Sequence, residues 1–257
     1  MKQSTFSSQI FFSLLIACLC ACPLMRAQES ADFFDPTRKE KQIESYTFRV
    51  DYRIEGGYSQ SHQRMTNDTV SALYLHGARI GATFDFILPK HFSVQTGLLY
   101  TIRYGKTTQH FHSSDPIMPQ AETLTNNNIE HLIAIPVRVY YSIPLWKQLS
   151  MYFYTGPQLT IGLAYSDYIT SNLSDATRTW LEANGRHTTS YDRYQAGELF
   201  RTNIQYGLGG GFEWDCYRIE AGYDFGLNNI LRLAPNPNDR MAEWEWHVSF
   251  VYRLNIN

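Results

Sequence analysis

The chain has 257 residues, which suggests one domain or at most two. Its formal net charge of -2 gives no support for nucleic-acid binding or for a polybasic membrane patch. Aromatic residues make up 15% of the chain, and the mean hydropathy is -0.33. A barrel that alternates lipid-facing and lumen-facing residues produces the same bland average.

Residues 1–27 are predicted to be a signal peptide for export. Lys2 supplies the positive charge, and residues 10–22 are apolar but too short for a spanning helix. Ala27 is a plausible last residue before the cleavage site. A lipobox-like pattern with Cys18 as the lipidated residue is the alternative, so cleavage after Ala27 and lipidation at Cys18 both stay open.

The mature chain is predicted to have two parts. Residues 28–45 are charged and have no clear period, which indicates a periplasmic N-terminal lead-in. Residues 46–257 are predicted to form a barrel. No run of about eighteen apolar residues occurs after the first thirty, so no spanning helix is expected there.

The main signal of residues 46–257 is an alternation of apolar and polar residues, repeated in eight segments. Successive side chains of a strand point to opposite faces, so this period of two predicts strands. Each segment has roughly ten to fourteen residues, and a tilted strand crosses the hydrocarbon with about 9–11. In chain order the segments are 46–58, 74–88, 92–104, 130–143, 149–161, 204–214, 217–227 and 244–256.

The last segment has the clearest alternation, with Trp244, Trp246 and Val248 against Glu245 and His247. A soluble sandwich or lipocalin-like barrel would alternate equally well. Aromatic residues near the strand ends, glycines beside the charged residues and the export signal favour a membrane barrel instead. We therefore predict an all-β, eight-stranded antiparallel up-and-down transmembrane β-barrel, closed, with a polar side-chain-filled lumen, in the lipid of a bacterial outer membrane.

The connections between the segments alternate between long and short. Outer-membrane barrels have short periplasmic turns and longer outer loops, so both chain ends are expected in the periplasm. Pro136 and Pro157 fall inside segments, where proline removes a ladder donor, and we expect β-bulges there. The expected long loops are 60–73, 105–128, 164–202 and 228–243, and the short turns are 89–91, 144–148 and 215–216.

Four short motifs follow one another along the barrel segments. They are IPVRVYY at 135–141, YTGPQ at 154–158, GLGGGFE at 207–213 and EAGYDFGLNNI at 220–230. In order and spacing they resemble motifs of the Bacteroidetes outer-membrane β-barrel family that is often called PorT-like. The resemblance covers about residues 45–257. The resemblance implies a porin-like barrel in the outer membrane more than it implies an activity. It also allows a role in a secretion or envelope assembly.

The face opposite the apolar one carries about seven arginines and nine acids. Buried charges must be paired, so their near-equal numbers predict a salt-bridged structural filling of the lumen. Eight strands leave an interior just wide enough for side chains to fill. A narrow, selective water path is the alternative. The predicted network is Arg49, Asp51, Arg53, Glu55, Arg79, Asp85, Arg103, Glu130, Arg138, Glu213, Arg218, Glu220, Asp224, Glu245 and Arg253, with Asp215 beside it.

Two patterns contain residue types that chemical sites use. His247 and Ser249 share a face with Glu245, and small barrel lipases use serine, histidine and an acid. Their spacing along one strand is about 6–7 Å, too long for a direct hydrogen bond, so no catalytic residue and no enzyme are predicted. His110 and His112 lack a third ligand, so neither a metal nor a cofactor is expected.

The leading prediction for function is a scaffold or interaction protein with long extracellular loops. A PorT-like component of a secretion or envelope assembly, with envelope or secretion proteins as partners, and a small selective pore are the alternatives. A lipid-modifying enzyme comes last. Asp68-Thr69-Val70 is similar to a three-residue O-glycosylation site, which makes Thr69 a candidate acceptor. The oligomeric state and the identity of partners stay open.

Overall fold

A computed structural model describes residues 49–65, 73–112, 121–183, 185–233 and 239–254. All of them belong to one compact unit, Phe48–Asn257. The signal peptide, the lead-in, Cys18 and Thr69 lie outside the described residues, and what the sequence predicts for them stays a prediction. None of the helices in the described part of the chain has the length and hydropathy that a bilayer span requires.

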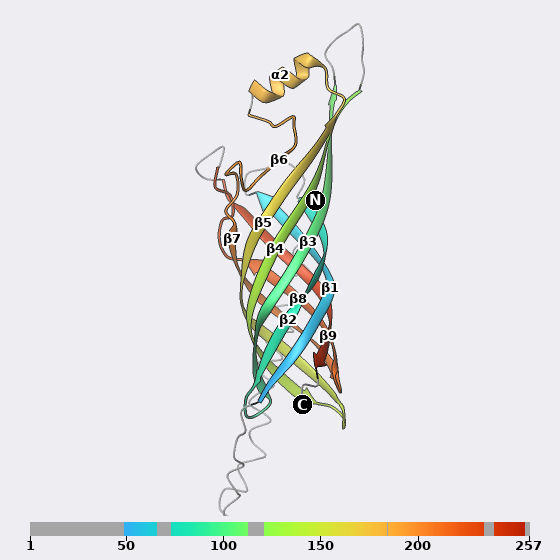
Figure 1. The fold of residues 1–257 in the computed structure, drawn as a ribbon, viewed down its shortest axis with the longest axis vertical. Helices are drawn as coiled ribbons and strands as arrows, with labels where there is room; N and C mark the ends of the chain where they lie inside the picture. The colour runs from blue at the N-terminus through green and yellow to red at the C-terminus, as the bar shows by residue number, and fades with distance from the viewer. Residues whose placement is uncertain (1–48, 66–72, 113–120, 184, 234–238, 255–257) are drawn as a thin grey trace, which may run out of the picture. The chain divides into compact units, whose positions relative to one another are not determined.

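Eight long strands form a closed antiparallel ring, as predicted (Figure 1). The order around the ring is β1-β2-β3-β4-β5-β7-β8-β9, and pairing of β9 with β1 closes it. A ninth strand of two residues, β6, pairs with β5 outside the ring. The elements are β1 Arg49–Met65, β2 Leu73–Ile87, β3 Phe92–His112, β4 Ala121–Pro144, β5 Leu149–Ser171, α2 Asp175–Ala183, β6 Tyr191–Asp192, β7 Thr202–Trp214, β8 Tyr217–Gly226 and β9 Met241–Leu254.

The alternation of residue types along each strand decides which side chains point inward. Along β9, buried positions with polar side chains, such as Glu245, alternate with exposed apolar ones, such as Phe250. Leu98 on β3 and Ile80 on β2 are 53% and 60% exposed. The buried interior of the ring is therefore polar and its outer surface apolar, the inverse of a soluble barrel.

Strands β3, β4 and β5 are much longer than predicted, with 21, 24 and 23 residues. β2 pairs with β3 only as far as Tyr104, and β7 pairs with β5 only as far as Ile161. Beyond these points residues 105–112, 121–128 and 164–171 form a three-stranded sheet, here called the extension. α2 lies at the same end (Figure 1).

The prediction of loops at 105–128 and 164–202 is therefore wrong for most of the first range and for the start of the second. These residues lack an apolar face, which is the signal on which the segments were recognised. Polar pairs across the strands hold the extension together instead. The Tyr104 hydroxyl donates to Asn127 at 3.0 Å, and Thr108 and Thr125 are hydrogen-bonded at 3.3 Å.

The pairing of β4 with β5 shifts by one residue between His131 and Leu132. Leu163 is the extra residue on β5. Before it, even-numbered residues such as Thr160 face inward, and after it odd-numbered residues such as Tyr165 and Asp167 do. The bulges predicted at Pro136 and Pro157 are not there, because the register is the same on both sides of them. Proline removes one donor from the ladder without adding a residue.

The predicted short turns are confirmed at the end of the ring opposite the extension. Lys90, His91 and Asp215 adopt left-handed φ values of 60°, 66° and 54°, which lets the chain reverse within a few residues. Asp215 is exposed in its turn, so its placement with the lumen charges is wrong.

Tyrosine rings fill the space that glycines leave inside the ring. A Cβ on Gly222 would overlap the Tyr154 hydroxyl and come within 2.8 Å of the His247 ring. Gly222→Ala is therefore expected to lower the free energy of unfolding by about 1–3 kcal/mol. Urea unfolding in lipid vesicles measures this, with Gly56→Ala as the matched control because nothing lies within 4 Å of its Cβ position. Equal losses in both variants would contradict the packing described here.

Candidate functional site

Charged side chains from seven strands meet inside the ring, and the first cluster lies near the short turns. Arg53 Nε is 2.7 Å from Asp85, and its Nη2 is 3.1 Å from Glu213. Arg218 reaches the same two carboxylates at 3.0 and 2.8 Å. Two arginines thus share two acids, which gives each charge more than one partner.

The second cluster centres on Arg138, which is fully buried. Its guanidinium contacts Glu220 at 3.2 Å and Asp224 at 3.4 Å, and it donates to Gln158 Oε1 at 3.0 Å. It also stacks over the ring of Tyr154, 4.7 Å from the ring centre. This arginine therefore crosses the lumen from β4 to β8 and holds two carboxylates.

The third cluster lies nearer the extension, around Arg103. Its guanidinium pairs with Glu130 at 3.2 Å and also with Glu243 and Glu245. The hydroxyl of Tyr194, in the segment between β6 and β7, donates to Glu130 at 2.9 Å. Burial and the nearby carboxylates raise the pKa of Tyr194, so this hydroxyl stays protonated.

The structure brings the predicted lumen charges together inside the ring. Arg79 joins them through Glu55, at 3.1 Å. Three members of the predicted network are not buried. Arg49 is exposed at the rim, and Glu213 and Arg253 are partly exposed. Glu243 was missed because it was placed in a loop. The buried members are Asp51, Arg53, Glu55, Arg79, Asp85, Arg103, Glu130, Arg138, Arg218, Glu220, Asp224 and Glu245.

The histidine and serine weighed as catalytic have separate partners within the lumen. His247 Nδ1 is 3.2 Å from Asp224, and its Nε2 is 3.0 Å from the Tyr154 hydroxyl. Ser249 donates to Glu55 at 2.7 Å. The structure thus places both in the buried charge network rather than in a serine–histidine pair.

An apolar cluster lies between these charges and the extension. Its members come from strands β2, β5 and β9 and from the segments that precede β7 and β9, and all are less than 10% exposed. Tyr194 packs against it and covers Gly162, where its ring occupies the space of a Cβ. The cluster is Leu75, Tyr165, Leu199, Ile230, Leu231 and Met241.

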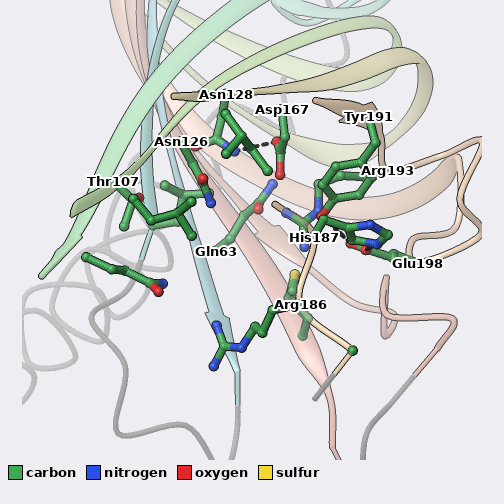
Figure 2. A pocket seen from close by; sticks show the side chains of 16 residues that line it. Gln63, Thr107, Asn126, Asn128, Asp167, Arg186, His187, Tyr191, Arg193 and Glu198 are labelled. Carbon is green, nitrogen blue, oxygen red and sulfur yellow. Dashed lines mark hydrogen bonds and ion pairs between the residues drawn. The ribbon is translucent and has the colours of Figure 1, made fainter. Parts of the chain in front are cut away.

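Beyond the apolar cluster the extension encloses a cavity of about 320 Å³, here called the mouth cavity (Figure 2). Its wall on the extension consists of inward residues of β3, β4 and β5, including Thr107, Asn126 and Asp167. The opposite wall is the segment between α2 and β7, with Arg186 and Tyr191. The volume is at the lower end of the ~300–1,000 Å³ typical of small-molecule sites.

Two amide oxygens of the mouth cavity accept no hydrogen bond from the residues that the structure describes. They are Oδ1 of Asn126 and Oδ1 of Asn128, both buried atoms on the inward face of β4. Asn128 is only 4% exposed, and its Nδ2 donates to Asp167. Figure 2 shows these side chains on the cavity wall. A buried acceptor without a donor costs free energy, which a bound ligand can recover.

The charged side chains of the mouth cavity balance one another. Arg193 Nε pairs with Glu198 at 3.0 Å, and His187 Nε2 lies 3.2 Å from the same carboxylate. Arg186 and Asp167 add one charge of each sign. The His187 ring stacks on Tyr191 with centres 3.9 Å apart.

None of these cavity residues was predicted as a site residue, because all of them fall in ranges that the sequence assigned to loops. His110, by contrast, lies on the exposed outer face of β3. Among the residues that the structure describes, no group of three His, Cys, Asp or Glu side chains is placed to hold a metal ion.

Comparison with solved structures finds outer-membrane barrels. Neisserial surface protein A is 10% identical with a TM-score of 0.42, covering 80% of this chain and 99% of that one. The outer membrane protease OmpT of Escherichia coli is 10% identical with a TM-score of 0.41, covering 82% and 99%. The outer membrane enzyme PagL is 6% identical with a TM-score of 0.37, covering 77% and 99%. No curated protein sequence matches the chain.

These structures overturn one prediction. The chain was predicted not to be an enzyme, and this prediction is contradicted, because the outer-membrane barrels to which the chain is similar include the enzyme PagL and the protease OmpT.

The family is established by a sequence model that covers most of the chain. The model for the outer membrane protein beta-barrel domain matches residues 27–232. The bacterial outer membrane, predicted from the export signal and the apolar outer face, is thereby confirmed. The narrower PorT-like assignment stays a prediction. The chain belongs to the outer membrane protein β-barrel family.

Proposed function

We propose that this protein is an outer-membrane interaction protein whose recognition surface is the extension with the mouth cavity. The supporting observation is the length of β3, β4 and β5, which have 21, 24 and 23 residues. A tilted strand needs about 9–11 to cross the hydrocarbon. The additional residues of these strands form ordered β-sheet, and polar side chains of that sheet line the mouth cavity. Because short turns of such barrels face the periplasm, the extension faces the outside of the cell.

The charged lumen is proposed to be structural filling. Its arginines each pair with acids on other strands, as Arg138 does with Glu220 and Asp224. The apolar cluster around Tyr165 lies across its outer end. The paired charges and the apolar cluster both argue against a continuous water path, because water needs hydrogen-bonding partners along its route. They therefore also argue against the small selective pore.

A role in an envelope or secretion assembly is the second candidate, favoured by one observation. Trp146, in the turn between β4 and β5, is 80% exposed, and Trp214 lines the same surface hollow. An exposed tryptophan at the periplasmic end could contact a periplasmic partner or the lipid headgroups.

The two candidates are distinguished by which end of the barrel a partner needs. In one variant a Gly-Ser link replaces residues 174–190, and in the other Trp146 becomes alanine. Both are extracted from native membranes in mild detergent beside the unchanged protein. Associated proteins, glycans and lipids are identified by mass spectrometry.

We expect an associated molecule that is lost with residues 174–190 and retained in Trp146→Ala. An association that survives the outer replacement and disappears in Trp146→Ala would contradict the recognition function and support the assembly role. Folding of each variant is checked by the mobility difference between unheated and boiled samples on a gel.

A further inference from the structure

We propose that the mouth cavity binds a neutral, polyhydroxylated ligand, namely a sugar unit of a glycan. This inference rests on the proposed function, because it names the ligand class of the same outward surface. Three properties of the described residues support it: unsatisfied acceptors, balanced charge and a mixed apolar and aromatic wall.

The acceptors are the first property. Oδ1 of Asn126 and Oδ1 of Asn128 are buried, line the cavity and receive no hydrogen bond from the described residues. The side-chain amide of Asn128 is fixed in orientation, because its Nδ2 donates to Asp167. Asn126 and Asn128 are two residues apart on β4, which separates their Cα atoms by about 6.6 Å. They can therefore accept from separate hydroxyl groups of one sugar ring or of two linked rings.

The charge balance is the second property. Asp167 and Glu198 are negative, and Arg186 and Arg193 are positive, so these four charges sum to zero. A net charge of zero gives no attraction to a strongly acidic ligand. It also disfavours a bare divalent cation, which prefers six or more oxygen ligands and would lie in the same cavity as two guanidinium groups. Hydroxyl groups, which both donate and accept, suit such a mixed lining.

The apolar part of the wall is the third property. Leu73, Leu124 and Ile169 line the cavity beside the stacked rings of His187 and Tyr191. A small-molecule site is typically apolar or aromatic with a few placed polar groups, and the C–H faces of a sugar ring fit that lining.

The experiment uses saturation-transfer NMR and calorimetry on the full chain in a zwitterionic detergent. Detergents with sugar headgroups are avoided because they would compete for the cavity. The probes are glucose, galactose, N-acetylglucosamine, lactose and maltose. Glucuronate and calcium chloride are the charged counter-probes.

Asn126→Ala removes one free acceptor and breaks no side-chain hydrogen bond to the residues that the structure describes. Its matched control is Thr170→Ala, since Thr170 is an exposed residue on the outer face of β5 in the extension. We expect at least one neutral sugar to bind the unchanged protein, about tenfold more weakly in Asn126→Ala and equally in Thr170→Ala.

Three results would overturn the sugar site: no neutral sugar binds, binding is insensitive to Asn126→Ala, or the charged counter-probes bind instead. If the sugars fail while replacement of residues 174–190 still removes an associated molecule, the sugar site alone is wrong. If that replacement removes nothing, the recognition function is wrong, whatever the sugars do.

Discussion

Replacing Arg138 with methionine is expected to lower the free energy of unfolding of the barrel by about 3–5 kcal/mol. The substitution keeps most of the side-chain volume and removes the charge. Glu220 and Asp224 then lose the guanidinium that lies 3.2 and 3.4 Å away, while both stay fully enclosed. Two buried carboxylates that lose their arginine are costly, because the desolvation penalty persists without that partner.

Urea unfolding in lipid vesicles, followed by tryptophan fluorescence, measures this effect. Arg253→Met is the matched control, because Arg253 lies at the rim, is 23% exposed and reaches Asp51 only at 3.5 Å. Its loss is expected to be about 0–1 kcal/mol. Similar losses in the two variants would contradict a structural role of the central pairs. A triple variant in which Glu220 and Asp224 are also neutralised to amides should recover part of the loss.

The strands that cross the membrane could be predicted because an apolar outer face imposes alternation on them. The lumen charges follow from the same alternation, since Arg53, Asp85 and Arg103 occupy positions opposite to the apolar residues. Their individual partners could not be predicted. Arg103 and Glu243 are 140 residues apart and meet only because the ring closes.

The extension and the mouth cavity escaped prediction because their strands lack an apolar face. Asn126, Asn128 and Thr107 lie on strands whose two faces are both polar, so the sequence there has the composition of a loop. The one-residue shift near Leu163 also reverses the alternation of β5, which moved Asp167 to the inner face. A single insertion of this kind changes the face on which every later residue of the strand lies. The composition of the sequence near the insertion does not reveal it.

Replacing Leu98 with arginine is expected to lower the free energy of unfolding in lipid vesicles by about 2–4 kcal/mol. Leu98 lies on the outer face of β3, six residues from its start, where a tilted strand reaches the middle of the hydrocarbon. A guanidinium there loses its hydration and finds no partner in lipid. The effect should fall when the same barrel is studied in a thin detergent micelle, where water lies closer.

Tyr168→Arg is the control that separates the membrane from exposure as such. Tyr168 lies on β5 in the extension, and its exposed fraction of 53% equals that of Leu98. Because the proposed function places the extension beyond the hydrocarbon, the second arginine is expected to stay hydrated and to cost about 0–1 kcal/mol. Equal, small effects at both positions would mean that the apolar belt does not face lipid. Equal, large effects would mean that the bilayer reaches the extension, which would remove the mouth cavity from the cell surface and with it the basis for recognition there.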